Sequence, residues 1–294
     1  MRRRIVPTLL AAAALTAAGC GGASEAGPEA KIVAAFYPLA FLAREVAPAA
    51  EVANVTPAGA EPHDLELTPG DVATLAGADL VLFLGNGFQP ALEKAVSGKE
   101  SALDLLEGLE LIEGADGHGD EEEHGDELEL DSHVWLDPMR FAAMAERVAE
   151  AVGEPGSASD VVAALEELDG EFRDGLARCE RDVIVTSHAA FGYLADAYGL
   201  RQVALAGLSP EAEPPPRALE ELIAEVKEEG ATTVFFETLT SPAVAETVAR
   251  EAGVRTAVLN PLEGLTEDEV TDGADYFSVM RVNLDVLRQA LGCT

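Results

Sequence analysis

The sequence predicts an α/β fold of two lobes, each a mainly parallel β-sheet flanked by helices. Three observations lead to this prediction. Short runs that are apolar throughout alternate with helical patterns in both halves of the chain, which is typical of parallel strands covered on both faces. The stretch 139–178 between the halves has helical patterns but no strand pattern. With 48% hydrophobic residues in 294, the chain also has ample apolar material for packed cores.

The first half begins with an apolar run at 31–36 that predicts a strand. The patterns that follow in chain order predict a helix at 39–46, a strand at 50–55, a helix at 69–76, a strand at 80–84, a helix at 88–97 and a strand at 109–112. A long helical pattern then starts at Pro138. Gly153 and Pro155 interrupt it, and Ser159 is a suitable N-cap for its continuation.

In the second half, strands and helices alternate again. In chain order the patterns predict a strand at 182–186, a helix at 189–198, a strand at 202–205, a helix at 214–229, a strand at 232–236, a helix at 242–252, a strand at 256–259 and a helix at 275–291. Two similar α/β halves joined by helix is the simplest interpretation.

The first residues predict a leader that is removed on export. A basic start precedes a short apolar run, and small residues stand directly before Cys20. The apolar run is too short to span a bilayer, so it is typical of a secretory signal. Its ending resembles a bacterial lipoprotein processing site, with an ordinary export signal as the alternative. We therefore expect a signal peptide over 1–19, lipid on Cys20 and a tether over 20–30.

The charge of the chain excludes one class of partner. Asp and Glu number 54 against 19 Lys and Arg, which gives a formal net charge of −35. A surface this acidic repels phosphate backbones and anionic lipid heads, which argues against nucleic acid as a partner. No segment after the leader is apolar enough to cross a membrane, so we expect an exported protein held by its lipid alone.

Two cysteines remain when Cys20 is assigned to lipid. Outside the cytoplasm, an even pair such as Cys179 and Cys293 predicts a disulfide. This bond would tie the end of the chain to the start of its second half. Two unpaired buried thiols are the alternative, because the sequence does not show that the two side chains meet.

Three of the five histidines stand at junctions between strands and loops. They are His63, His133 and His188. Ligands of α/β sheets bind at the carboxyl ends of strands, so a cleft between the halves could gather all three. Neutral imidazole is the commonest metal ligand, and three imidazoles with one further position suit zinc. For each histidine alone, a polar residue in a turn remains the alternative.

The other two histidines, His118 and His124, lie in an acidic run punctuated by glycine. Such a run buries too little apolar area to fold alone and predicts a loop. It could collect divalent cations weakly, or it could be a solvated acidic insertion.

Five segments together resemble the zinc/manganese family of ABC-transporter solute-binding lipoproteins. They are 36–39 (FYPL), 59–69 (GAEPHDLELTP), 131–138 (DSHVWLDP), 186–194 (TSHAAFGYL) and 235–242 (FFETLTSP). The resemblance implies two lobes bridged by one long helix, with metal held in the cleft between them. It places the N-terminal metal-binding lobe at 31–138, the linking helix at 139–178 and the C-terminal metal-binding lobe at 179–294.

The resemblance also implies the ligands. His63 and His133 match the two ligands of the first lobe, and His188 matches a third position that resembles a Glu in the manganese branch. The fourth ligand is commonly an Asp where this chain has Asn260, whose neutral amide oxygen is a poor partner for zinc.

The fourth position therefore stays open between water and carboxylates from nearby loops. Glu237 at a strand end is the first candidate and Glu61 the second. Glu237 could instead orient His188 without touching the metal.

The function implied is capture of Zn²⁺ outside the cytoplasm and delivery to the permease of an ABC importer, by a monomer that is not an enzyme. Three imidazoles favour zinc over manganese, which prefers carboxylate oxygen. A manganese-specific member of the family is the first alternative. A zinc-dependent hydrolase is the second, although no nucleophile or phosphate-loop motif accompanies the histidines. A surface adhesin is compatible with the same fold.

Overall fold

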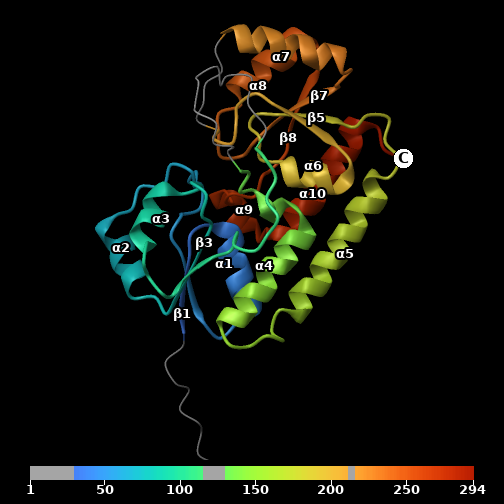
Figure 1. The fold of residues 1–294 in the computed structure, drawn as a ribbon. Helices are drawn as coiled ribbons and strands as arrows, with labels where there is room; N and C mark the ends of the chain where they lie inside the picture. Colours follow the sequence, from blue (N-terminus) through green and yellow to red (C-terminus); the bar gives the residue numbers. More distant parts are fainter. Residues whose placement is uncertain (1–29, 115–129, 211–215) are drawn as a thin grey trace, which may run out of the picture.

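The computed structural model describes residues 30–114, 130–210 and 216–294. They form two four-stranded parallel sheets flanked by helices, which confirms the predicted fold class (Figure 1). The first sheet has the strand order β2-β1-β3-β4, and the second has the order β6-β5-β7-β8. The same order recurs in both sheets, so the chain is built from two similar halves.

The first sheet differs from the prediction at one edge. Its elements are β1 (Lys31–Ala34), α1 (Tyr37–Val46), β2 (Glu51–Asn54), α2 (Pro69–Ala76), β3 (Leu80–Phe83), α3 (Pro90–Val96) and β4 (Ala102–Asp104). The fourth strand is β4, and the expected strand at 109–112 is wrong, because these residues pair with no strand and only the next residue, Glu113, makes an isolated bridge, to Leu130. Thr68 closes a capping box with Asp71 at the start of α2.

The segment between the lobes consists of two helices, of which the second bridges the lobes, so the linking helix is shorter than the expected range 139–178. After a short 3-10 turn at Val134–Leu136, α4 spans Pro138–Ala151 and α5 spans Ser159–Leu176. Gly153 has φ +79°, a left-handed conformation that ends α4, and Pro155 follows two residues later. The two helices lie side by side in Figure 1, and α5 carries the chain to the second sheet.

The second lobe continues past its sheet into two C-terminal helices. Its elements are β5 (Val183–Thr186), α6 (Gly192–Tyr198), β6 (Arg201–Ala204), α7 (Pro216–Glu228), β7 (Thr233–Phe236), α8 (Ala243–Ala252), β8 (Arg255–Val258), α9 (Glu267–Asp272) and α10 (Tyr276–Leu291). The short helix α9 is absent from the sequence prediction. Within the described ranges, no helix is both long and apolar enough to cross a membrane.

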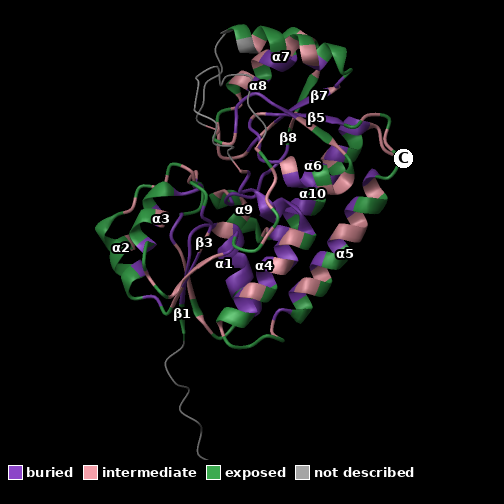
Figure 2. Cartoon of the chain, viewed as in Figure 1, coloured by how far each residue is buried: buried purple, intermediate pink, exposed green. Residues whose placement is uncertain are grey.

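The larger core joins the two lobes. It includes residues of α1, α4 and α10, and Figure 2 shows the buried stretches of these helices where the lobes meet. The ring of Tyr276 at the start of α10 stacks on Phe41 of α1 at 5.6 Å and lies 4.5 Å from the ring of Phe141 in α4. A smaller core lies within the second lobe and includes Val185 and Val234. Because the lobes share apolar contacts, the loops between them are held in place from both sides.

The structure joins the sulfur atoms of Cys179 and Cys293, the two cysteines that the sequence analysis pairs. Cys179 follows α5, and Cys293 follows α10 at the C-terminus, marked in Figure 1. The backbone N–H of Thr294 also donates to the carbonyl of Arg178 at 3.0 Å. The end of the chain is therefore tied to the point where the second lobe begins.

Candidate metal site

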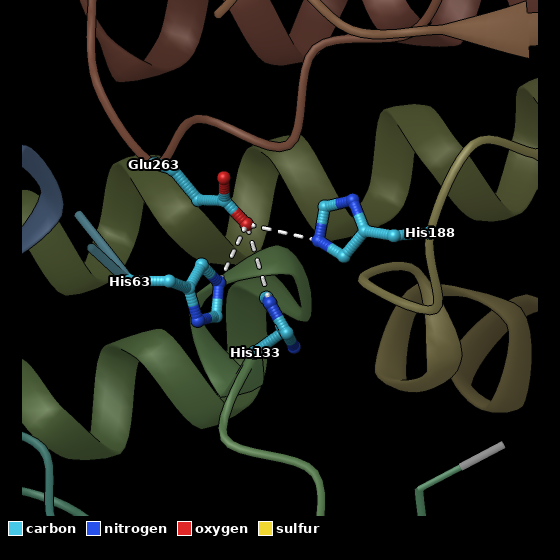
Figure 3. Close-up of side chains that lie close together, drawn as sticks. All are labelled: His63, His133, His188 and Glu263. Carbon is cyan, nitrogen blue, oxygen red and sulfur yellow. Dashed lines mark hydrogen bonds and ion pairs between the residues drawn. The ribbon is translucent and has the colours of Figure 1, made fainter. Parts of the chain in front are cut away.

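The three histidines predicted from the strand ends lie together between the lobes (Figure 3). The ring centroids of His133 and His188 are 5.3 Å apart, those of His63 and His133 are 5.5 Å apart, and those of His63 and His188 are 6.1 Å apart. His63 comes from the loop after β2 and His188 from the loop after β5. His133 directly precedes the 3-10 turn that leads into α4. The site therefore draws on both lobes.

The fourth member of the group is Glu263, in the loop after β8. Its Oε1 atom lies 3.4 Å from Nε2 of His63, 3.2 Å from Nε2 of His133 and 3.1 Å from Nε2 of His188. Figure 3 shows the three rings pointing their Nε2 atoms at this one oxygen. With a side chain 1% exposed, Glu263 is a buried carboxylate whose neighbours are three imidazoles.

A tight turn directs Glu263 into the cluster. The side-chain oxygen of Asn260 accepts a hydrogen bond from the N–H of Leu262 at 2.8 Å. Leu262 has φ +58°, which is uncommon for a residue other than glycine and reverses the chain just before Glu263. On its other side, the amide nitrogen of Asn260 donates to Glu269 at 3.1 Å. The amide of Asn260 thus supports the turn, and the structure places it outside the group of four.

Glu237, the first candidate for the fourth position, lies on the other side of the His188 ring. Its Oε1 atom is 2.6 Å from Nδ1 of His188, whereas the cluster lies at Nε2. Ser187 donates a second hydrogen bond to the same oxygen. Instead of Glu237, the group of four includes Glu263, which corrects the sequence-based choice. The reason is geometric: an imidazole has two nitrogens on opposite sides, and a carboxylate occupies each.

Glu61, the second candidate, also lies outside the group. One of its oxygens accepts a hydrogen bond from the N–H of His63 at 3.2 Å, and the other is buried without a hydrogen-bond partner. Burial and the nearby charge of Glu263 raise the pKa of Glu61 to about 8. Glu61 therefore supports the loop that carries His63.

Two of the three rings are oriented by carboxylates at Nδ1. The Oδ1 atom of Asp131 lies 2.7 Å from Nδ1 of His133 and also accepts the N–H of His133 at 2.8 Å. In the same way, the Oε1 atom of Glu237 lies 2.6 Å from Nδ1 of His188. A carboxylate at one ring nitrogen fixes the tautomer and presents the other nitrogen to a metal. His63 is steadied differently, by the ring of Phe88, whose centroid is 4.5 Å away in an edge contact.

Buried charges shift the pKa values of the four groups. Burial, together with the nearby charges of His133 and His188, lowers the pKa of His63 against the opposing effect of Glu263. Burial also opposes charge on His133, but the carboxylates of Asp131 and Glu263 outweigh it and raise the pKa of His133 to about 9. Glu237 and Glu263 likewise raise the pKa of His188 against the effect of burial. In return, the charge of His188 and the hydrogen bonds from the histidines outweigh burial and hold the pKa of Glu263 well below its usual range.

The donor set suits a four-coordinate zinc ion. Ligand atoms about 2.0–2.1 Å from a tetrahedral metal are about 3.3–3.4 Å from one another. The Glu263 oxygen lies 3.1 to 3.4 Å from the three imidazole nitrogens, close to this spacing, and all four ligand atoms lie within 4.8 Å of one another. A cavity of about 180 Å³ reaches the rings of His63 and His133 past Asp64 and Ser132.

Sequence reasoning missed two residues of this arrangement, Glu263 and Asp131. Each stands close to a residue that the sequence analysis names: Glu263 lies three residues after Asn260, and Asp131 lies two residues before the predicted ligand His133. Three predicted residues lie outside the described ranges: the lipidation residue Cys20 and the loop histidines His118 and His124.

Comparison with known proteins points the same way. The family model described as zinc-uptake complex component A, periplasmic, matches residues 32–290. The high-affinity zinc uptake system protein ZnuA of Bacillus subtilis is 34% identical, over 96% of each chain. The zinc-binding lipoprotein AdcA of Streptococcus pneumoniae is 36% identical over 98% of this chain, which spans only 61% of the length of AdcA.

Solved structures give the same picture. The Zn(II)-bound ZnuA-like domain of Streptococcus pneumoniae AdcA superposes with a TM-score of 0.74 at 34% identity, covering 90% of this chain and 99% of that domain. The laminin binding protein Lmb of Streptococcus agalactiae, described as having adhesin and metal transporting activity, has a TM-score of 0.77 at 28% identity. That match covers 89% of this chain and 99% of Lmb.

Proposed function

The chain belongs to the family of periplasmic component A of zinc-uptake complexes, and from this premise we propose that it captures Zn²⁺ between its lobes and delivers it to the permease of an ABC importer. The observation that carries the proposal is the convergence of three Nε2 atoms, from His63, His133 and His188, on the Glu263 carboxylate. The ligands come from both lobes, so bound metal would brace one lobe against the other.

The family consists of solute-binding proteins, and the protein is not an enzyme. The donor set supports this, because a catalytic zinc keeps an open position for water or substrate. Four protein donors would complete a tetrahedral zinc sphere here. The Glu237 carboxylate, which could otherwise act as a base, is committed to Nδ1 of His188.

Zinc is favoured over manganese by the same donors. Imidazole is a borderline-soft ligand that suits zinc, whereas manganese prefers oxygen, and this set offers three nitrogens and one carboxylate. The relatives ZnuA and AdcA are named for zinc uptake and zinc binding. We also propose that the acidic run with His118 and His124 collects divalent cations weakly. This run would bind further cations but would not form part of the tight zinc site.

The protein acts outside the cytoplasm, as its family does. We propose further that Cys20 carries the lipid that anchors it to the outer face of the membrane, that the Cys179–Cys293 bond forms in this oxidising compartment, and that the chain works as a monomer. Incorporation of labelled palmitate tests the anchor. Label that persists in Cys20→Ser would contradict it.

The decisive experiment is metal analysis of protein purified without chelator, followed by competitive zinc titration. We expect one tightly bound zinc per chain and its loss in His63→Ala, His133→Ala and His188→Ala. His124→Ala is the matched control, because it removes an imidazole from the acidic run and should keep the tight site. Tight zinc binding that survives all three substitutions would refute the proposed site.

A further inference from the structure

Tyr193 of the second lobe contacts Asp131 of the first lobe, and Asp131 in turn contacts the candidate ligand His133. Tyr193 is the second residue of α6, and its side chain is fully buried. Its hydroxyl donates a hydrogen bond to the backbone carbonyl of Asp131 at 2.7 Å and accepts one from the N–H of Ile112 at 3.1 Å. The N–H of Asp131 in turn donates to the carbonyl of Ile112 at 2.9 Å. The tyrosine hydroxyl therefore closes a buried ring of hydrogen bonds around Asp131.

Asp131 is the residue that orients His133. Its carboxylate accepts hydrogen bonds from both the backbone and Nδ1 of His133, at 2.8 and 2.7 Å. A shift of the Asp131 backbone would therefore move the carboxylate and turn the imidazole. Since the Nε2 atom of His133 lies 3.2 Å from Glu263, a turn of the ring would change the spacing of the donor atoms.

Gly192, the residue before Tyr193, also helps to hold Asp131 in place. A Cβ atom added at Gly192 would lie 2.7 Å from Oδ2 of Asp131, closer than real Cβ contacts allow. The backbone of α6 thus packs directly against the orienting carboxylate. The guanidinium of Arg140 covers the tyrosine ring at 4.8 Å, which holds it in this position.

From these contacts we infer that Tyr193 is a positioning residue for metal binding: its hydroxyl fixes Asp131, and Asp131 fixes the ring of His133. His188 lies only five residues earlier in the same segment of the second lobe. One segment therefore supplies a ligand of its own and also sets the angle of a ligand on the first lobe. This inference rests on the proposed zinc site and adds a residue that determines its geometry.

The test is zinc affinity in Tyr193→Phe, which removes the hydroxyl and keeps the ring. Substitution of a residue that orients a ligand typically weakens binding by about 10- to 100-fold, and because Tyr193 acts through Asp131 we expect about 10-fold. Tyr198→Phe is the matched control. Tyr198 lies on the same helix and also donates through its hydroxyl, but the acceptor, at 3.3 Å, is Asp169 of α5 instead of Asp131.

Two further readouts separate positioning from a general loss of stability. In the Co²⁺-loaded protein, the d–d absorption bands report ligand geometry, and we expect them to change in Tyr193→Phe and not in Tyr198→Phe. In a double-mutant cycle with Asp131→Asn, the two losses of affinity should be clearly less than additive, because both act on the same ring. Gly192→Ala provides a second variant, which should weaken zinc binding by displacing the Asp131 carboxylate.

The outcomes are distinguishable. Absence of tight zinc binding in the unsubstituted protein would contradict the proposed function itself. Tight binding there, with Tyr193→Phe within twofold of it, unchanged cobalt bands or additive losses in the cycle, would overturn the positioning role alone.

Discussion

Glu263→Gln is the sharpest test of the metal site, because it keeps the shape of the side chain and removes its charge. The Glu263 oxygen lies 3.1 to 3.4 Å from three imidazole nitrogens and is buried. At that separation, with an effective dielectric constant of about 20, a unit charge interacts by about 5 kcal/mol with each unit of opposite charge. Part of this gain is offset by the cost of keeping a carboxylate away from water and by the attraction of Glu263 to the protonated rings in the metal-free site. We expect a net loss of about 3–4 kcal/mol, or zinc affinity lower by about 100- to 1,000-fold.

Competitive titration against a chromophoric chelator measures this loss, and Glu237→Gln is the matched comparison. Glu237 is equally buried and touches the same histidine, but at Nδ1. Its loss should therefore cost only the 10- to 100-fold typical of a residue that orients a ligand. Thermal unfolding of both metal-free variants checks that they fold. If Glu237→Gln weakened zinc more than Glu263→Gln, or if Glu263→Gln stayed within threefold of the unsubstituted protein, Glu263 would not be the fourth ligand.

Three other outcomes are expected. Zinc binding should release protons at pH 7.5, because the pKa of His133 is raised to about 9 and its ring is therefore protonated in the metal-free protein at that pH. The affinity for zinc should accordingly fall as the pH drops below about 9. Calorimetric heats of binding that do not depend on the buffer would contradict this proton release. Cys179→Ser with Cys293→Ser should lower the free energy of unfolding in urea by about 3–5 kcal/mol, because the bond closes a loop of sequence separation 114, while zinc stoichiometry stays at one. His188→Glu should shift preference from zinc toward manganese, and unchanged relative affinities in a competition titration would be evidence against a role for His188 in metal selection.

The raised pKa of His133 has the opposite effect on the stability of the metal-free protein, which should decrease as the pH rises. The pKa of His133 is higher in the folded protein than the ordinary value of 6.5, so its ion pair stabilises the fold fully below pH 6.5. This contribution is lost as pH rises through about 9. The stability of the free protein and its affinity for zinc should therefore change in opposite directions between pH 6.5 and 9, and urea unfolding with and without zinc measures both.

The sequence was sufficient for the parts of the fold that depend on local pattern. The runs that became β3 (LVLF) and β5 (VIVT) are almost entirely apolar, and parallel pairing in a covered sheet satisfies their backbone hydrogen bonds. The break between α4 and α5 was also visible in the sequence, because Gly153 and Pro155 interrupt the helical pattern and Ser159 begins the next helix. In each case the information lies within a few neighbouring residues.

The fourth ligand could not be found in this way. Glu237 and Glu263 both follow strands of the second sheet, and a strand end predicts the edge that a residue occupies but not the side of a ring that it reaches. That choice depends on the turn at Leu262, which has a positive φ. A leucine gives no indication of a positive φ, so this turn could not be predicted from the residue type. The orienting role of Asp131 depends likewise on its distance from His133 in space, although the spacing of two residues hinted at it.

The charges around Glu263 explain how one buried site can exist both with and without metal. In the free protein, the raised pKa values of His133 and His188 favour the protonated rings, which places two positive charges beside the Glu263 carboxylate. Zinc replaces two protons with an ion of the same total charge, since its ligands bind as neutral imidazoles. The buried charge therefore stays nearly constant, and Glu263 has a cationic partner in both states. Because zinc and protons compete for the same imidazoles, a low pH favours release of zinc and a high pH favours its binding.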